Sequence, residues 1–184
     1  MIIYWKMNRH HEFTSIDYLK NGNDKQKQIR EVLLRNRIFD ILAEFSPVLA
    51  GTFPIKIDIP GSDLDILCCF ANHDNFSSVL KENFQTQDGF TLQEMEMEGE
   101  RIVLVNFNLE GFPVEIFGQN IPVLQQRAFR HMIVEHRILH EQGEAFRNEI
   151  IRLKIAGVKT EPAFAQLLGI EGDPYLGLLE YGEK

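Results

Sequence analysis

Cysteine and long apolar runs are both scarce in this sequence, and each absence excludes a class of protein. The only two cysteines, Cys68 and Cys69, are adjacent, so they cannot join distant segments and do not have the spacing of a metal site. No apolar run approaches the roughly 20 residues that span a bilayer, and the N-terminal residues lack the pattern of a signal peptide. We therefore expect a cytoplasmic protein with reduced thiols and no membrane contact.

Positive charge is scarce as well. Lysine and arginine number 19 against 27 aspartates and glutamates, which gives a net charge of -8 and an isoelectric point of about 5.3. An acidic surface repels a phosphate backbone, so extended nucleic-acid binding is not expected. A local basic patch is still compatible with a bound nucleotide or with the end of an RNA.

The rest of the composition is that of a folded domain. The chain has 184 residues, of which 44% are hydrophobic and 25% are charged, and its 14 phenylalanines supply bulky core side chains. These values fit one compact unit. Within it we expect an α/β core over residues 1–120 and a helical part over residues 121–184 packed on that core.

Hydrophobic periodicity and turn residues predict the order of the elements. Apolar residues at helical spacing predict one long helix from a turn at residues 21–24 to Phe45. Strict alternation predicts a hairpin formed by residues 92–98 and 101–109. Further predicted strands lie at residues 48–53, 55–59, 64–70 and 112–117, and further predicted helices at 75–84, 121–140, 143–156 and after Thr160 and Asp173. This order indicates an α+β fold, in which a mixed β-sheet is flanked by helices and followed by a helical C-terminal part. Pro113 favours an edge position or an irregular start for its strand.

The strongest chemical signal is Asp63-Leu64-Asp65, which opens the predicted strand over residues 64–70. Residues two apart on a strand project from the same face, so the two carboxylates lie side by side. They repel each other unless a cation bridges them or solvent screens them, and oxygen ligands at this spacing suit Mg²⁺ or Mn²⁺. On its own the pattern is also typical of an exposed strand edge.

Glu115 is the single charge in the apolar run FPVEIF. An ionised carboxylate in such a strand is costly to bury unless it is paired or bound to a metal. If this strand neighbours that of Asp65, the three carboxylates can hold two metal ions, which stabilise the attacking and departing oxygens of a phosphoryl transfer. The alternative interpretation of Glu115 is a salt-bridged or edge-exposed acid.

Gly51-Thr52 stands at the junction between the first predicted strand and a loop. Glycine lets a backbone approach a phosphate closely, and the adjacent hydroxyl can donate a hydrogen bond. Asp58 lies between this pair and Asp63, and we interpret it as a loop carboxylate that caps a turn.

A glycine followed by a small hydroxylated residue, then ten residues and D-x-D on a strand, resembles the signature of the polymerase-beta-like nucleotidyltransferase superfamily. The long helix before Gly51 and the acid on a later strand match that pattern as well. More narrowly, several segments are similar to an uncharacterised bacterial domain family within the superfamily, over about residues 25–181. These segments are GTFPIKIDIPGSDLDI, FPVEIFGQ, FRHMIVEHRIL, KTEPAFA and GDPYLGLLE.

This resemblance implies a role for each residue of the motif. It implies that Gly51 and Thr52 contact the phosphates of a nucleoside triphosphate, and that Asp63 and Asp65 ligate two Mg²⁺ or Mn²⁺ ions. It further implies that Glu115 ligates the catalytic ion and helps to activate the attacking hydroxyl. The sequence departs from the usual pattern at two positions, because Thr52 stands where serine is usual and Glu115 stands where aspartate is commoner.

A bound triphosphate also requires cationic side chains beyond the metals. Those near one face of the predicted helix over residues 121–140 are Arg127, Arg130, His131 and Arg137. We assign Arg127 and Arg130 to nucleotide binding, with Lys154 and Lys159 as further candidates. The alternative is that the row is the solvated face of a core helix.

The leading hypothesis is an enzyme that transfers a nucleoside monophosphate from a nucleoside triphosphate to a hydroxyl acceptor by two-metal-ion catalysis. The acceptor is a small molecule, a protein side chain or an RNA end, and the acidic surface favours the first two. The competing hypothesis is a non-catalytic module that binds a nucleotide or a protein through a degenerate site. A weaker third is a metal-dependent phosphohydrolase, which would release phosphate rather than pyrophosphate.

Overall fold

A five-stranded mixed β-sheet forms the centre of the computed structural model, which describes residues 10–97 and 99–183. The strand order is β1-β2-β5-β4-β3. The strands are β1 (Val48–Ala50), β2 (Leu64–Cys69), β3 (Thr91–Met97), β4 (Glu100–Leu109) and β5 (Phe112–Gln119). Neighbouring β2 and β5 are parallel, and the other neighbouring pairs are antiparallel. The predicted α+β class with a mixed sheet is confirmed.

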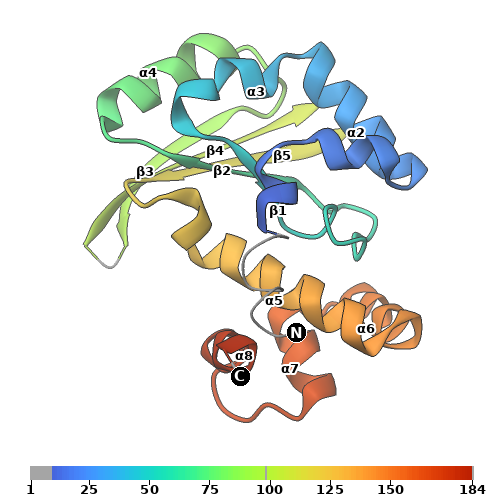
Figure 1. Cartoon of the computed structure of the whole chain (residues 1–184). Coiled ribbons are helices and arrows are strands. Elements are labelled where there is room, and N and C mark those ends of the chain that lie inside the picture. The colour runs from blue at the N-terminus through green and yellow to red at the C-terminus, as the bar shows by residue number, and fades with distance from the viewer. Residues whose placement is uncertain (1–9, 98, 184) are drawn as a thin grey trace.

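Helices lie on both faces of this sheet (Figure 1). The helices over one face are α2 (Asp24–Arg35), α3 (Ile38–Ile41) and α4 (His73–Phe84). Those on the other side are α5 (Arg127–Gln142), α6 (Glu144–Ile155), α7 (Thr160–Leu168) and α8 (Pro174–Glu183). Short 3-10 helices are η1 (His10–Thr14), η2 (Asp17–Asn21), η3 (Ala43–Phe45) and η4 (Val123–Gln125).

Each face of the sheet has its own hydrophobic cluster, because strand side chains alternate between the faces. The cluster under α2 and α4 includes Leu33, Phe76, Leu64, Ile66, Val105 and Ile116. The cluster under α5–α8 includes Val48, Leu67, Phe129, Met132, Leu153 and Phe164. The helical part therefore shares its core with the sheet. The division near residue 120 stays a prediction.

The predicted single helix from residues 21–24 to Phe45 is wrong in its length. It begins as predicted, with Asn23 capping α2 through its side chain and Gln26 bonding back to the Asn23 backbone. It then breaks at Asn36 and Arg37, where Arg37 takes a left-handed conformation with φ 53°. The remainder forms the separate short helices α3 and η3.

The segment between β1 and β2 is a loop, so the strand predicted at residues 55–59 is wrong and the one at 48–53 is shortened. Its backbone carbonyls bond to side chains of flanking helices instead of to a neighbouring strand. Gln26 on α2 donates from Nε2 to the carbonyls of Phe53 and Pro54 at 2.9 and 3.1 Å. From α6, Arg147 donates to the carbonyl of Ile55 and Lys154 to that of Ile57. Helices on both sides thus fix the loop that joins β1 to β2.

Strand β5 lies inside the sheet, between β2 and β4. Pro113 pairs with Asn108 on β4, but pairing with β2 begins only at Val114. The missing amide hydrogen of proline therefore costs no bond to β2. The edge position that Pro113 favoured is wrong, and its place at the start of the strand is right.

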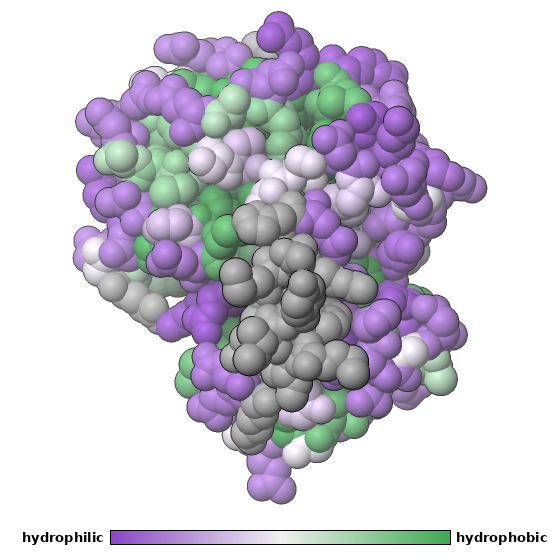
Figure 2. Space-filling view, in the orientation of Figure 1, coloured by the Kyte–Doolittle hydropathy of each residue, from purple (hydrophilic) through white to green (hydrophobic). Residues whose placement is uncertain are grey.

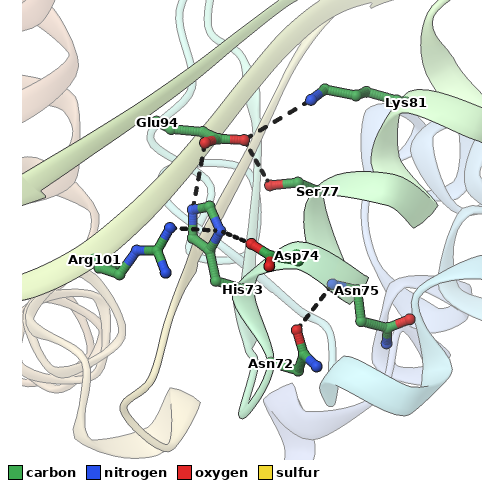
Figure 3. A network of polar contacts seen from close by, with 8 residues as sticks. All are labelled: Asn72, His73, Asp74, Asn75, Ser77, Lys81, Glu94 and Arg101. Atoms are coloured by element: carbon green, nitrogen blue, oxygen red, sulfur yellow. Dashed lines mark hydrogen bonds and ion pairs between the residues drawn. The ribbon is translucent and has the colours of Figure 1, made fainter.

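A polar network attaches the β3–β4 hairpin to α4 (Figure 3). His73 lies at the start of α4 and its imidazole is buried. Its Nδ1 atom is 3.1 Å from Oδ1 of Asp74 and 3.1 Å from Nη2 of Arg101 on β4. Its Nε2 lies 3.7 Å from Glu94 on β3, and Glu94 accepts a hydrogen bond from Ser77 at 3.0 Å. The network holds the end of the hairpin in place on one side of the sheet.

Close packing of α4 on β5 gives a first testable result. A Cβ added at Gly118 would lie 2.1 Å from Cε1 of Phe76. We expect Gly118→Ala to lower the free energy of unfolding by about 1–3 kcal/mol, because the phenyl ring must move out of a packed core. Thermal melting measures this. The double variant with Phe76→Leu should lose less than the sum of the single losses, and strictly additive losses would contradict the contact.

Hydrophilic residues cover most of the face shown in Figure 2, with smaller apolar areas among them. In the part of the chain that the structure describes, no helix has the length and apolarity needed to cross a bilayer. Cys68 and Cys69 are free thiols at the end of β2, the first buried and the second partly buried.

Candidate active site

The three carboxylates predicted from the sequence come together at the start of two neighbouring strands. Asp65 on β2 is the direct partner of Glu115 on β5, so the two side chains leave the sheet on the same face. Asp63 directly precedes β2. All three line a single cavity of about 1150 Å³ between the sheet and the helical part. We call these three residues the carboxylate row.

Repulsion within the carboxylate row appears in its pKa values. Burial is the largest cause that raises the pKa of Asp65 to about 8, and the charges of Asp63 and Glu115 act in the same direction. The pKa of Glu115 is also raised, first by burial and then by Asp63. Lys154 lowers the pKa of Asp65 in part. The carboxylates are therefore close enough to act on one another, and a bound cation would relieve their repulsion.

Gly51 brings the backbone against the carboxylate row. It follows β1, whose last residue Ala50 pairs with Asp65. Its φ of 74° favours glycine, and a Cβ here would lie only 1.8 Å from Oδ2 of Asp65. Thr52 comes next and lines the same cavity. The glycine is therefore needed both for the turn and for the close approach of the backbone to Asp65.

Some of the predicted cationic side chains line the cavity, and Arg137 does not. Arg127 and Arg130, at the start of α5, line it, as do the further candidates Lys154 and Lys159. Arg130 also lies 3.3 Å from Glu183 on α8. Arg137 is used elsewhere, because it donates to the backbone carbonyls of residues 181 and 182. The interpretation of this helix face as simply solvated is wrong at His131, which is buried and lines the cavity.

Sequence reasoning missed three further carboxyl groups that line the cavity, of which Glu100 lies at the start of β4. Glu135 on α5 is buried and Glu161 on α7 is partly buried, and both line the cavity. A signal for the first was present, because Glu135 falls on the apolar face of its helix beside Met132 and Ile138. No comparable signal marked Glu161, which only the packing of α7 brings to the site.

The carboxylate row fits a divalent metal in its chemistry, although it is not gathered around one. Within residues 10–97 and 99–183, no three His, Cys, Asp or Glu side chains converge closely enough to hold an ion as they stand. The donors are hard oxygen ligands, which Mg²⁺ and Mn²⁺ prefer. Their repulsion in the absence of a cation is a physical reason for them to stand apart.

Comparison with known proteins places the chain in a family and identifies its fold. Residues 31–181 match the model of a family described as Domain of unknown function (DUF4269). No curated protein sequence matches the chain.

Solved structures resemble the fold at low sequence identity. The Cid1 poly(U) polymerase with MgGTP bound is 16% identical, with a TM-score of 0.52, over 79% of this chain and 47% of that one. A second Cid1 structure, described for its RNA terminal uridylyl transferase activity, is also 16% identical, with a TM-score of 0.52. The match covers 79% of this chain and 46% of that one. The chain spans about half the length of these proteins. The likeness shows the nucleotidyltransferase fold that the sequence predicted.

Proposed function

The chain belongs to the DUF4269 family, and we propose that it is a nucleotidyltransferase that moves a nucleoside monophosphate from a nucleoside triphosphate to a hydroxyl acceptor. One observation carries this proposal. The carboxylate row, the Gly51-Thr52 pair and the two assigned arginines all line one cavity of a nucleotidyltransferase fold. If the sequence motif were accidental, there would be no reason for the predicted metal ligands and the predicted phosphate-binding residues to line the same cavity.

In the proposed reaction, the hydroxyl oxygen of the acceptor forms a bond to the α-phosphorus. The bond from that phosphorus to the α–β bridging oxygen breaks, and pyrophosphate leaves with the electron pair. The proton of the hydroxyl passes to Glu115, whose pKa is raised by burial and by the charge of Asp63, which strengthens it as a proton acceptor. Asp63, Asp65 and Glu115 would hold two Mg²⁺ or Mn²⁺ ions, which neutralise the charge on the phosphate and pyrophosphate oxygens.

The remaining residues of the site position the triphosphate. The backbone at Gly51 and the hydroxyl of Thr52 would donate hydrogen bonds to phosphate oxygens. Arg127 and Arg130 would supply positive charge from the start of α5, with Lys154 and Lys159 beyond them. These groups act by position and charge, so no covalent intermediate with the protein is needed.

A second candidate function is a nucleotide-binding module with a degenerate catalytic site. The observation that favours it is that the carboxylates, in the part of the chain described, do not converge on one metal position. Dependence of nucleotide binding on Mg²⁺ and on the two aspartates separates the candidates.

We expect the melting temperature to rise when Mg²⁺ and the correct nucleoside triphosphate are added together, with ATP, GTP, CTP and UTP tested in turn. At a hundredfold excess over the dissociation constant, binding stabilises the folded state by about 2.7 kcal/mol, which corresponds to roughly 5–10 °C for this size of domain. The variant with both Asp63→Asn and Asp65→Asn should show no rise. Release of pyrophosphate on adding acceptors then distinguishes transfer from hydrolysis to phosphate.

Asp58→Asn is the matched control, because Asp58 is the nearest aspartate in sequence and does not line the cavity. It should keep the Mg²⁺-dependent rise. An equal rise in the double variant would contradict the metal role of the aspartates and favour the binding module.

A further inference from the structure

Glu135 is a buried carboxyl group that the proposed reaction does not use. Its side chain points from α5 into the cavity, and the residue is only 4% exposed. Among the described residues, none makes a hydrogen bond or an ion pair with it. Its carboxyl oxygens are not among the polar atoms that the fold encloses without a partner, so they stay open to the cavity, where a ligand can contact them.

The surroundings of Glu135 come from three helices. Glu161 on α7 raises its pKa and Lys154 on α6 lowers it, while burial is the largest cause and brings the pKa to about 8. One turn earlier on α5, His131 donates from Nε2 to the carbonyl of Tyr175 at 2.9 Å. This leaves its Nδ1 facing Glu161, 3.7 Å from the carboxylate.

Carboxyl groups outnumber cations around Lys154. Its ammonium donates to the carbonyl of Ile57 at 2.8 Å, and four carboxyl groups act on it. These are Glu135, Asp58, Asp65 and Glu161. Asp65 belongs to the carboxylate row. Glu135 and Glu161 are then left with Lys154 as a shared cation, and the hydrogen bond of Lys154 goes to the carbonyl of Ile57. Glu135 therefore has no cation of its own at this wall of the cavity, and burial holds its pKa at about 8.

This imbalance selects the charge of the ligand. A phosphate placed between Glu135 and Glu161 would be repelled by Glu161 and would oppose ionisation of Glu135, and a neutral group would leave Glu135 protonated. An ammonium group offers three N–H donors and one positive charge to two adjacent carboxylates. The nucleobases of the triphosphates carry no amine that is protonated at neutral pH, so the ammonium belongs to the acceptor.

We propose that Glu135 and Glu161 bind an ammonium group, and that the acceptor is a small molecule carrying an amine as well as the hydroxyl that reacts. The inference rests on the proposed nucleotidyl transfer in the same cavity. The amine contacts Glu135 and Glu161, while the hydroxyl is presented to the carboxylate row that lines the same space.

Binding of hydroxyl-bearing amines without nucleotide or metal tests the proposal. The probes are hexosamines and aminocyclitols at millimolar concentration, each with its counterpart in which hydroxyl replaces the amine, such as glucosamine against glucose. We expect melting temperatures to rise with amines and not with the neutral counterparts. Calorimetry in buffers of different ionisation enthalpy should show that amine binding at neutral pH releases a proton, since Glu135 must ionise.

The isosteric variants Glu135→Gln and Glu161→Gln should each bind the amine roughly tenfold to hundredfold more weakly, and Glu135→Gln should lose the proton release. Glu100→Gln, which alters a carboxylate of the same cavity on the β3–β4 hairpin, should leave amine binding unchanged. Both Glu135→Gln and Glu161→Gln should keep the Mg²⁺-dependent rise with the triphosphate. Loss of that rise in the parent protein would overturn the proposed function and leave the amine result standing.

Three outcomes would overturn the amine proposal. The first is equal binding of amines and neutral counterparts, and the second is no rise with any amine of the panel. The third is a rise with uncharged nucleosides that disappears in Glu135→Gln, because the two glutamates would then recognise the nucleobase of the donor.

Discussion

Gly51→Ala is expected to abolish Mg²⁺-dependent nucleotide binding and to lower the melting temperature of the metal-free protein. The new methyl group would lie 1.8 Å from Oδ2 of Asp65, so the carboxylate must leave its position. The φ of 74° adds a strain of about 1–2 kcal/mol for any residue with a Cβ. Together these effects should cost about 2–5 kcal/mol of folding stability. Thermal melting with and without Mg²⁺ and the triphosphate measures both consequences.

Gly111→Ala separates backbone strain from the clash. Gly111 has a φ of 86°, yet nothing lies within 4 Å of an added Cβ. This control should therefore lose only the strain energy and should keep nucleotide binding. The double variant Gly51→Ala with Asp65→Ala removes the clashing carboxylate, so its stability should recover towards that of Gly111→Ala. Unchanged nucleotide binding in Gly51→Ala would show that Asp65 is not a ligand.

The carboxylate row could be predicted because its signals are local. Two aspartates at a spacing of two residues share a face on any strand, so Asp63 and Asp65 needed no tertiary information. Glu115 required one further condition, that its strand neighbours β2, and the structure meets it through the pairing of Glu115 with Asp65. Local sequence does not encode strand order, which is why that placement was conditional.

Errors in the fold arose where tertiary contacts override local pattern. Residues 55–59 alternate like a strand, but their carbonyls accept hydrogen bonds from Arg147 and Lys154 on α6. Arg37 breaks the long helix without a glycine or a proline at that point, so periodicity alone extended the helix through it. Glu135 and Glu161 line the same cavity only because α7 packs on α6 and α6 packs on α5. A separation of 26 residues hides such a pair from pattern reasoning.

Glu135 should also control how the stability of the protein changes with pH. Burial raises its pKa from 4.5 to about 8, with Glu161 acting in the same direction and Lys154 opposing it. Between these two pH values the folded state binds more protons than the unfolded state, so the free energy of unfolding falls as pH rises. The loss levels off once the pH has risen past the folded-state pKa of about 8. A pKa difference of one between the folded and unfolded states corresponds to about 1.4 kcal/mol, so the total loss is on the order of several kcal/mol.

Glu135→Gln removes the titrating group while keeping its shape, so its melting temperature should fall less than that of the parent protein between about pH 5 and about pH 9. As pH rises, the melting temperature of the variant should therefore increase relative to that of the parent, by about 2–4 °C for each kcal/mol of unfolding free energy that the parent loses. Glu149→Gln gives the opposite control. The pKa of that exposed carboxylate is lowered by a hydrogen bond from Arg152, so it adds stability at higher pH and its removal cannot flatten the fall. Parallel curves for Glu135→Gln and the parent would mean that Glu135 is solvated or already paired, and would remove the support for a ligand at this wall of the cavity.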